Sequence, residues 1–313
     1  MADGSRWSRQ ALKSRPRPVQ RALQKHGRYP YSPICGRAAY DWPGGRRLAV
    51  YVGLNIEHFD FGAGLGAALG PKSPEPDVLN YSWRDYGNRV GVWRCLELFE
   101  ELKVPAAAIL NTALYDYCPE VIAACVRRGD EIVGHGRTNS ERQGDLPEAE
   151  EKKLLESCRD RIARESGRAP RGWLSPWISE SAVTPYLLAE TGYRYTLNWC
   201  HDDQPTTFRT RSGKPLWAIP YPQELNDIPM IVARQMDGRD FADLIVDNFD
   251  EMLRQCESQP LVMGIALHPY LVGQPYRLRH LRRALKHLAS RPQRVWWTTP
   301  GAILDATEAA AAR

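Results

Sequence analysis

The chain has 313 residues, and its composition of 43% hydrophobic and 25% charged residues is typical of a soluble globular protein. This length exceeds one usual domain but lies within reach of a single α/β barrel. No run of about eighteen or more apolar residues occurs, so the sequence predicts no association with a membrane. The first ten residues lack the apolar segment of a secretory signal, which leads us to expect a cytoplasmic protein.

The net charge of +5 is unevenly distributed along the chain. Residues 1–47 contain 11 Lys and Arg against 2 Asp and Glu, which gives this part +9 and leaves −4 for the remainder. Because Trp7, Tyr29 and Tyr31 are interleaved with these charges, we expect residues 1–45 to form a basic arm that packs on a neighbour or makes an oligomer contact. The alternatives are a segment that binds nucleic acid or another acidic surface, and an organelle transit peptide. Since the sequence has no basic–aromatic RNA motif, we expect no nucleic-acid partner.

From residue 46 onward, strand-like apolar runs alternate with amphipathic helical segments. In chain order, the first half predicts a strand over 46–55, a helix over 93–103, a strand over 104–110, a helix over 119–129, a strand over 131–135 and a helix over 147–167. The second half predicts a strand over 171–175, a helix over 180–192, a strand over 193–199, an irregular region over 200–240, a helix near 240–257, a strand over 261–268, a helix over 277–290, a strand over 294–297 and a last short helix. This alternation predicts a parallel sheet covered by helices, in a single domain that covers residues 46–313.

Polar and ionisable residues stand at the carboxyl ends of five of these predicted strands. They are Glu57 and His58, then His135, then Ser175, then His201 with Asp202 and Asp203, and finally His268. In a parallel α/β barrel such strand ends converge on one face, which is where active sites are built. The sequence therefore predicts a functional site assembled from these residues.

Each of these residues also has a structural interpretation. A lone histidine at a strand end, such as His135, is more often a hydrogen-bonded structural group than a ligand. The segment HDDQP that begins at His201 also forms a good turn, in which Asp side chains bond the backbone before proline. Ser175 lacks the G-x-S-x-G elbow of a serine nucleophile. We expect a functional role for His135 because Glu57 and His268 also stand at the carboxyl ends of predicted strands.

Taken together, the motifs resemble the polysaccharide deacetylase (NodB-homology) superfamily over roughly residues 46–306. The resemblance rests on the segments NIEHFDFG (55–62), GHGRTNSE (134–141), GWLSPW (172–177), HDDQP (201–205) and LHPYLVGQP (267–275). The chain looks most similar to the branch of metal-independent allantoinases and cytoplasmic peptidoglycan-deacetylase-like enzymes. This resemblance implies an α/β fold, an irregular (β/α)7-type barrel, in an often oligomeric hydrolase of non-peptide C–N bonds. We accordingly expect a homo-oligomer, either a dimer or a tetramer.

The resemblance also implies roles for particular residues. His135 matches the first histidine of the family's His-x-x-x-His metal pair, and His268 matches its late acid. Glu57 stands where an acidic ligand or base is expected, and the adjacent position is occupied by Asn55 or His58. The SPW segment, with Ser175 and Trp177, resembles the substrate-groove segment. Asp202 and Asp203 resemble the loop below the pocket, which completes the expected substrate-binding set.

The chain departs from the family pattern at the metal pair. Asn139 replaces the second histidine, and a neutral amide is a poor ligand for a zinc-like ion. Glu141 is a possible substitute carboxylate, so the possible metal ligands are Glu57, His135, Asn139 and Glu141. The allantoinase-like members also lack the second histidine. We therefore expect either no cofactor or one zinc-like divalent ion.

These observations favour a hydrolase that acts on a small amide, ureide or imide. In this hypothesis Glu57 is the base that activates water, His135 orients the water or polarises the carbonyl, and His268 protonates the leaving nitrogen. The second hypothesis is a metal-dependent deacetylase of an N-acetylated sugar. The third is a non-catalytic protein that keeps the barrel and its pocket.

Overall fold

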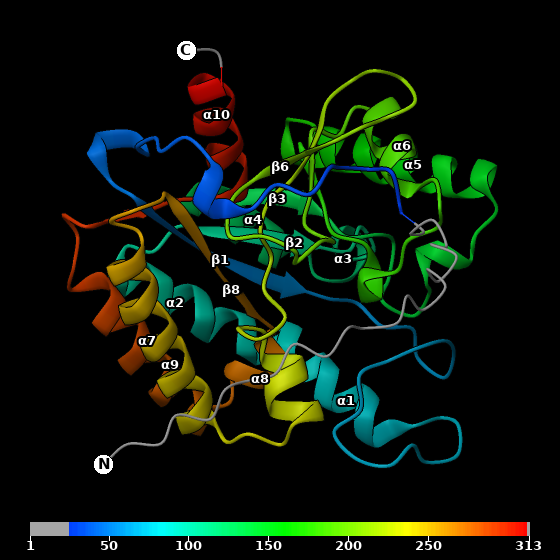
Figure 1. Cartoon of the computed structure of the whole chain (residues 1–313). Helices are drawn as coiled ribbons and strands as arrows, with labels where there is room; N and C mark the ends of the chain where they lie inside the picture. Colours follow the sequence, from blue (N-terminus) through cyan, green and yellow to red (C-terminus); the bar gives the residue numbers. More distant parts are fainter. Residues whose placement is uncertain (1–24, 312–313) are drawn as a thin grey trace, which may run out of the picture.

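The structure, a computed structural model, describes residues 25–311 and is built around one sheet of nine strands. The strands follow one another across the sheet in the order β6-β7-β5-β4-β3-β2-β1-β8, and β9 lies against β1. Figure 1 labels β1, β2, β3, β6 and β8. All pairs are parallel except β6 with β7. The strands are β1 (Leu48–Ile56), β2 (Ala106–Leu110), β3 (Glu131–Gly134), β4 (Gly172–Trp173), β5 (Tyr195–Thr196), β6 (Thr206–Phe208), β7 (Leu216–Ala218), β8 (Leu261–Leu267) and β9 (Val295–Trp297).

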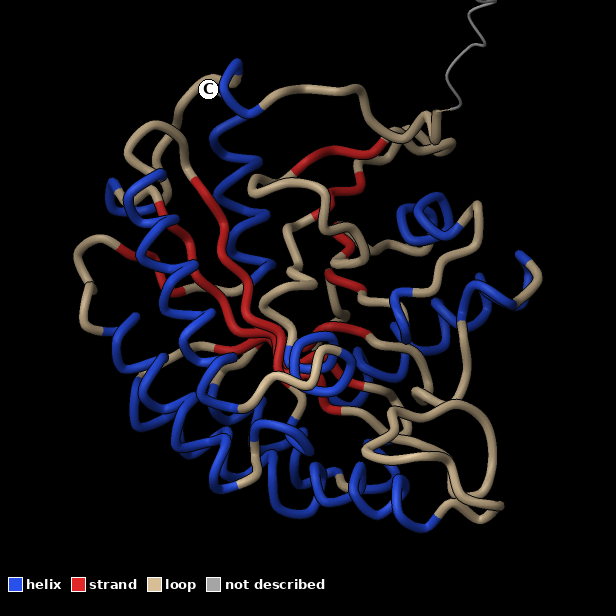
Figure 2. The backbone as a smooth tube through the Cα atoms, turned by 60° about the horizontal axis from the view of Figure 1, so that its bottom comes forward, coloured by secondary structure: helices blue, strands red, loops and turns tan. Residues whose placement is uncertain are grey.

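Helices alternate with the parallel strands and cover the outside of the curved sheet (Figure 2). The α-helices are α1 (Val78–Tyr86), α2 (Val92–Leu102), α3 (Leu114–Tyr117), α4 (Pro119–Arg128), α5 (Glu148–Ser166), α6 (Thr184–Glu190), α7 (Gly238–Gln255), α8 (Pro269–Val272), α9 (Pro275–Ala289) and α10 (Pro300–Ala311). Every strand and helix predicted from the sequence is present, with ends that differ by a few residues. The sequence prediction missed α1, α3, α8, β6 and β7, which are mostly too short to show a hydrophobic period.

Strand β1 is the centre of the fold, and all nine of its residues are buried. It lies between β8 and β2, with β9 beside its first three residues. Such a strand is covered on both faces, which explains its nearly continuous apolar sequence. Alternate residues such as Val50 and Val52 pack against the helices, whereas Ala49 and Tyr51 point into the barrel. The same alternation brings Asn55 and Glu57 to the inner side at the carboxyl end.

The ring between the two ends of the sheet is completed by irregular chain rather than by a regular strand pair. The backbone N–H of Val262 donates to the carbonyl of Asp203 over 2.9 Å, and that of Ala266 donates to Leu225 over 2.9 Å. A single parallel bridge joins Asn226 to Ala266. The region that the sequence marks as irregular thus closes the barrel, and the expected irregular (β/α)7-type barrel is confirmed.

The part of the N-terminal arm that the structure describes packs on its own chain. The ring of Tyr29 stacks on His201 with 4.2 Å between centroids, and Arg37 forms a 2.5 Å ion pair with Asp202. Trp42 is buried and donates from its indole nitrogen to the carbonyl of Leu261 over 3.1 Å. The contacting residues of 25–45 thus pack on the barrel of their own chain, and a contact of the arm with a second copy stays a prediction. Residues 1–24, which include Trp7, lie outside the described part.

Within residues 25–311, no helix combines the length and apolar character that crossing a membrane requires.

The close packing of β4 against β5 gives a test of this fold. A Cβ added at Gly172 would overlap the ring of Tyr195, whose hydroxyl donates to Glu131 over 3.0 Å. We expect Gly172→Ala to lower the free energy of unfolding by about 1–3 kcal/mol, measured by urea denaturation, because overpacking forces the ring to shift. Gly36→Ala is the control, since Gly36 is exposed and has no atom closer than 4.0 Å to an added Cβ. Equal stability of the two variants would contradict this account of the β4–β5 contact.

Candidate active site

The carboxyl ends of β1, β3, β4 and β8 surround a pocket of about 170 Å³. The pocket brings together Glu57, His135 and His268, which the sequence places on three different strand ends. All three side chains are buried, with 6%, 2% and 5% of their surface exposed. The polar and aromatic residues that also line it are Asn55, Phe59, Asn139, Ser175, Trp177, Tyr221, Gln223, Asn226 and Tyr270, and the aliphatic ones are Ala67, Leu174, Ile178, Ile228 and Pro229.

Glu57 is the centre of this pocket, and both of its carboxylate oxygens are engaged. Oε1 accepts a 2.5 Å hydrogen bond from the side-chain amide of Asn139. The same oxygen lies 3.5 Å from Nε2 of His135 and 3.5 Å from Nε2 of His268. Oε2 accepts a 2.8 Å hydrogen bond from the hydroxyl of Tyr270. One buried carboxylate therefore contacts two imidazoles and two hydrogen-bond donors.

His268 is held from its other side by Asp227, which is fully buried. One carboxylate oxygen of Asp227 is 2.6 Å from Nδ1 of the ring, and the other accepts the backbone N–H of His268 over 2.8 Å. The His268 ring therefore lies between two carboxylates, Asp227 at Nδ1 and Glu57 at Nε2. This arrangement stabilises the ring as an imidazolium.

The charges in this group shift the pKa values in opposite directions. Burial alone would raise the pKa of Glu57, but the charge of His268 and the contacts with both imidazoles lower it to about 2. Burial alone would lower the pKa of His268, but Asp227 and Glu57 raise it to about 10. Burial raises the pKa of Asp227, and His268 opposes that effect. At neutral pH the pocket thus contains a Glu57 carboxylate beside a His268 imidazolium.

His135 differs from His268 in its hydrogen bonding. Its Nδ1 lies 2.7 Å from the carbonyl oxygen of Leu174, so Nδ1 carries a proton and donates it to that carbonyl. In the neutral ring the lone pair is then on Nε2. That buried atom has no hydrogen-bond partner, because Glu57 at 3.5 Å is too distant for an ordinary N–H···O bond. His135 therefore points an uncommitted nitrogen into the pocket.

A chain of hydrogen bonds fixes the orientation of Asn139. The backbone N–H of His58 donates to Oδ1 of Asn111 over 2.8 Å, which identifies the other end of the Asn111 amide as the donor. That donor bonds the carbonyl of His135 and, over 3.0 Å, Oδ1 of Asn139. The amide nitrogen of Asn139 is therefore the group that faces Glu57. Reversal of the amide would place two oxygens against each other at one end and two donors at the other.

This orientation decides whether the residues fit the metal ion that the family pattern implies. Zinc needs at least three protein ligands with free lone pairs. Asn139 points N–H groups toward Glu57, and the His268 imidazolium has no lone pair to offer. Only Glu57 and His135 remain as donors. Among residues 25–311, no group of three or more His, Cys, Asp or Glu side chains is arranged to hold a metal ion. The donor set does not fit a zinc-like ion.

Three of the residues expected to bind substrate lie in the pocket, but two of them are committed to the protein. Asn55 is bonded through its side-chain amide to Tyr221 and to the carbonyl of Leu267. The hydroxyl of Ser175 accepts hydrogen bonds from Trp173 and Asn198, over 3.1 and 2.9 Å. The third expected substrate-binding residue in the pocket is Trp177.

Trp177 forms part of the pocket wall and has an unusual backbone. Its φ is +63° and that of Ile178 is +52°, a region that non-glycine residues rarely adopt. Each such residue costs about 1–3 kcal/mol, and this kind of strain gathers at functional sites. The indole is 39% exposed and donates over 2.9 Å to the carbonyl of Asn139. The strained turn thus holds a large aromatic surface against the pocket.

The structure does not bring five of the expected residues into this pocket. His58 faces Tyr117 and Asp60 instead. Glu141 pairs with Arg137 over 2.7 and 3.0 Å and does not line the pocket. His201 stacks on Tyr29, and the remaining two residues are Asp202 and Asp203.

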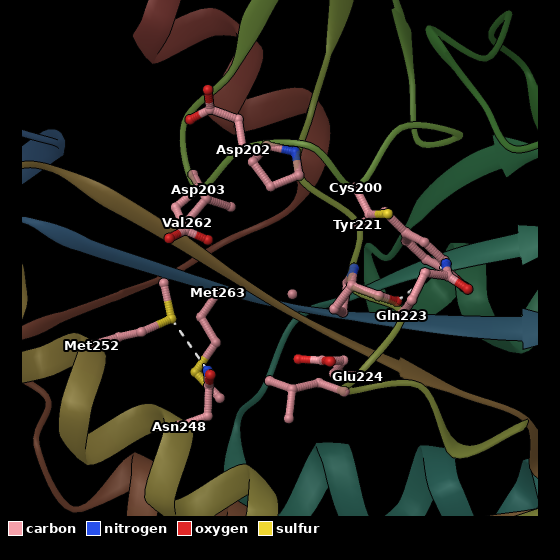
Figure 3. Close-up of a pocket in the computed structure, with 14 residues that line it drawn as sticks. Cys200, Asp202, Asp203, Tyr221, Gln223, Glu224, Asn248, Met252, Val262 and Met263 are labelled. Atoms are coloured by element: carbon pink, nitrogen blue, oxygen red, sulfur yellow. Dashed lines mark hydrogen bonds between the residues drawn. The ribbon is translucent and has the colours of Figure 1, made fainter. Parts of the chain in front are cut away.

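Asp202 and Asp203 line a different pocket of about 370 Å³, between β8 and the chain that closes the barrel (Figure 3). Figure 3 shows them above β8, across from Tyr221 and Gln223. The order of the motifs in the sequence predicts Asp202 and Asp203 beside the substrate, whereas the structure places them in this other pocket. The ion pair of Asp202 with Arg37 of the N-terminal segment holds this loop elsewhere.

Sequence reasoning missed several residues of the site. Asp227 lies in the irregular region, where an acidic residue near a proline looks like a turn. Tyr270 follows the LHP motif, yet nothing local indicates that its hydroxyl reaches Glu57. Asn111 could have been predicted from the sequence, because it directly follows a predicted strand, as other residues of the site do.

Comparisons with known proteins identify relatives of this chain. A family model described as polysaccharide deacetylase matches residues 77–196. A putative polysaccharide deacetylase of Schizosaccharomyces pombe is 29% identical over 282 residues, which cover 85% of this chain and 87% of that protein. Together these matches support the assignment of the chain to the polysaccharide deacetylase (NodB-homology) superfamily.

Two further proteins match this chain over almost their whole length. The peptidoglycan deacetylase of Helicobacter pylori is 25% identical over 293 residues, 83% of this chain and 96% of that protein. The crystal structure of Puue allantoinase superposes with a TM-score of 0.80 and 28% identity, covering 90% of this chain and 98% of that one. The polysaccharide deacetylase fold is thus present throughout the barrel.

The ion pair at the centre of the site predicts a pH-dependent stability. Because the pKa of His268 is about 10 in the folded protein and 6.5 without perturbation, its protonation stabilises the fold fully below pH 6.5 and ceases to do so as the pH rises through 10. We expect His268→Gln to cost on the order of 3–5 kcal/mol at pH 6, a difference that shrinks toward pH 10. Urea denaturation at pH 6, 8 and 10 measures this difference. The surface variant His280→Gln is the control, and a cost of His268→Gln that does not change with pH would contradict the ion pair.

Proposed function

We propose that the protein is a hydrolase that cleaves a non-peptide C–N bond of a small amide, ureide or imide. One observation carries this proposal: a proton donor and a proton acceptor face the same pocket on either side of one buried carboxylate. These are the imidazolium of His268 and the uncommitted Nε2 of His135. Similarity to relatives named as deacetylases and as an allantoinase supports the same reaction class here.

In this proposal His268 is the general acid. As the C–N bond breaks, Nε2 of the ring gives its proton to the leaving nitrogen. Because its pKa is about 10, the ring stays protonated at neutral pH and holds the proton that the departing nitrogen needs. Asp227 keeps the ring in the orientation that presents Nε2 to the pocket.

We assign the general base to His135 rather than to Glu57. A carboxylate with a pKa of about 2 is a weak base, and both of its oxygens already accept hydrogen bonds. Nε2 of His135 has a free lone pair in the neutral ring and no competing partner. Water gives a proton to this nitrogen while its oxygen adds to the substrate carbonyl carbon. Glu57 then acts as the fixed negative charge that keeps His268 protonated.

The pocket favours a small and planar substrate. Its volume of about 170 Å³ accommodates a compact molecule rather than several sugar units. Phe59, Trp177 and Tyr221 supply flat apolar walls, and Gln223 and Asn226 supply amides. A planar substrate with several carbonyl and N–H groups, such as a ureide or imide, suits both features. The cytoplasmic location and the dimer or tetramer expected from the sequence stay predictions.

The assignment of the base is tested with His135→Ala. We expect kcat on a responsive ureide or imide to fall by about 10²–10⁴-fold, and added imidazole to restore part of it, because the free base enters the vacated space. Glu57→Gln should also lose most of its turnover without unfolding, but imidazole should not restore it. Near-normal activity of Glu57→Gln would overturn the role of this carboxylate, and near-normal activity of His135→Ala would overturn that of the base.

Metal removal separates this proposal from a metal-dependent deacetylase of N-acetylated sugars. Since the donor set does not fit a zinc-like ion, we expect activity to survive dialysis against EDTA and to gain nothing from added zinc, nickel or cobalt. Elemental mass spectrometry of the wild type and of His135→Ala gives the metal content independently of activity. A stoichiometric metal ion that is lost in His135→Ala would favour the deacetylase instead. Ligand binding without turnover across a broad amide panel would favour the non-catalytic alternative.

A further inference from the structure

Hydrolysis by the acid and base proposed above leaves one task unassigned. When water adds to an amide carbonyl, negative charge develops on the carbonyl oxygen, and its stabilisation is usually the largest single contribution to catalysis. Because the donor set does not fit a metal ion, an N–H or O–H group of the pocket must approach this oxygen. The assignment of this donor to a particular residue depends on the proposed hydrolase function.

Most donors that line the pocket are already committed to protein acceptors. The side-chain amide of Asn139 and the hydroxyl of Tyr270 both donate to Glu57. The indole N–H of Trp177 donates to a backbone carbonyl. Donation by the Tyr270 hydroxyl or the Trp177 indole to a substrate would break a bond that holds the central carboxylate or the pocket wall, and one of the two N–H groups of Asn139 is held by Glu57.

Two of the inner donors near β1 and β4 are committed as well. The hydroxyl of Tyr221 and the amide of Asn55 bond each other over 2.9 and 3.2 Å, and the Asn55 amide also donates to Leu267. The oxygen of Ser175 accepts from Trp173 and Asn198, and this side chain is fully buried, so its O–H is less accessible to a substrate than the amide of Asn226, a residue that is 6% exposed.

Asn226 is different, because its amide is oriented and its donor end is uncommitted. Oδ1 accepts the backbone N–H of Ile228 over 3.1 Å, so the amide nitrogen points the opposite way. Among the described residues that nitrogen has no hydrogen-bond partner. The side chain is 6% exposed and lines the pocket that contains Glu57, His135 and His268.

The backbone around Asn226 is also rigidly placed. Asn226 bridges to Ala266 of β8, two residues before His268, and it directly precedes Asp227. The donor and the general acid are therefore positioned by the same two pieces of chain. The other amide of this segment, Gln223, has only a weak 3.4 Å contact to the carbonyl of its own neighbour, Pro222, and so is not oriented.

We propose that the amide nitrogen of Asn226 donates a hydrogen bond to the carbonyl oxygen of the scissile amide and stabilises the charge that develops there. The N–H donates without transferring its proton. As the tetrahedral intermediate collapses and the C–N bond breaks, the oxygen returns to a carbonyl. Asn226 is thus a catalytic residue of the proposed reaction.

Two substitutions distinguish this role from a structural one. Asn226→Asp keeps an oxygen that accepts the Ile228 N–H but replaces the donor with a second oxygen. Asn226→Ala removes both ends. A donor role predicts that both variants lose about 10²–10³-fold in kcat with little change in KM. A structural role predicts that Asn226→Asp stays close to the wild type. Gln223→Ala is the matched control and should change KM more than kcat.

The wild type must first turn over a member of the ureide and imide panel. Absence of any turnover would overturn the proposed function, whereas an active wild type with near-normal kcat in Asn226→Asp would overturn only the role of Asn226. Thermal melting and the pH 6 to pH 10 change in stability check each variant for an intact His268–Asp227 pair. Because Asn226→Asp also adds a negative charge, a loss in that variant without a loss in Asn226→Ala would contradict the donor role as well.

Discussion

The buried negative charge of Glu57 is the interaction on which the rest of the site depends. A carboxylate removed from water is very costly unless it is paired and hydrogen-bonded, and here it contacts two donors and two imidazoles. These partners come from the loops after β3 and β8, so the charge also ties the two sides of the barrel together. Loss of one partner of such a pair typically costs about 3–5 kcal/mol, which restricts substitution at every position around it.

A second constraint runs from the backbone to this charge through two side-chain amides. The backbone N–H of His58 can only donate, so it fixes which end of the Asn111 amide is the acceptor. The other end of Asn111 in turn fixes the orientation of the Asn139 amide. At the position where the resemblance implies a second metal-binding histidine, this chain has a hydrogen-bond donor to Glu57. Asn139 is thus more than a missing ligand, because its amide helps to stabilise the buried carboxylate.

The fold and the site carry different kinds of information about this protein. A deacetylase and an allantoinase both match the barrel over nearly their full lengths, so the architecture alone does not select a substrate. Selection comes from the pocket, where the aromatic walls and the amides of the closing segment meet the charged group. That segment, which includes Asn226 and Asp227, completes the ring against β8 and supplies polar groups to the site. The irregular backbone of this segment both closes the barrel and places polar groups in the pocket.

The sequence by itself determined the order of strands and helices and three central residues, Glu57, His135 and His268. It succeeded there because long apolar runs show their period, and because the ends of parallel strands meet on one face. Only the tertiary structure decided that Asp202 lies in a different pocket, that Asp227 holds His268, and that Asn139 faces Glu57 with its nitrogen. These features depend on contacts between residues dozens of positions apart, such as Arg37 with Asp202, which no local pattern encodes. The polarity of an amide, in particular, is set by its neighbours in space and leaves no trace in the sequence.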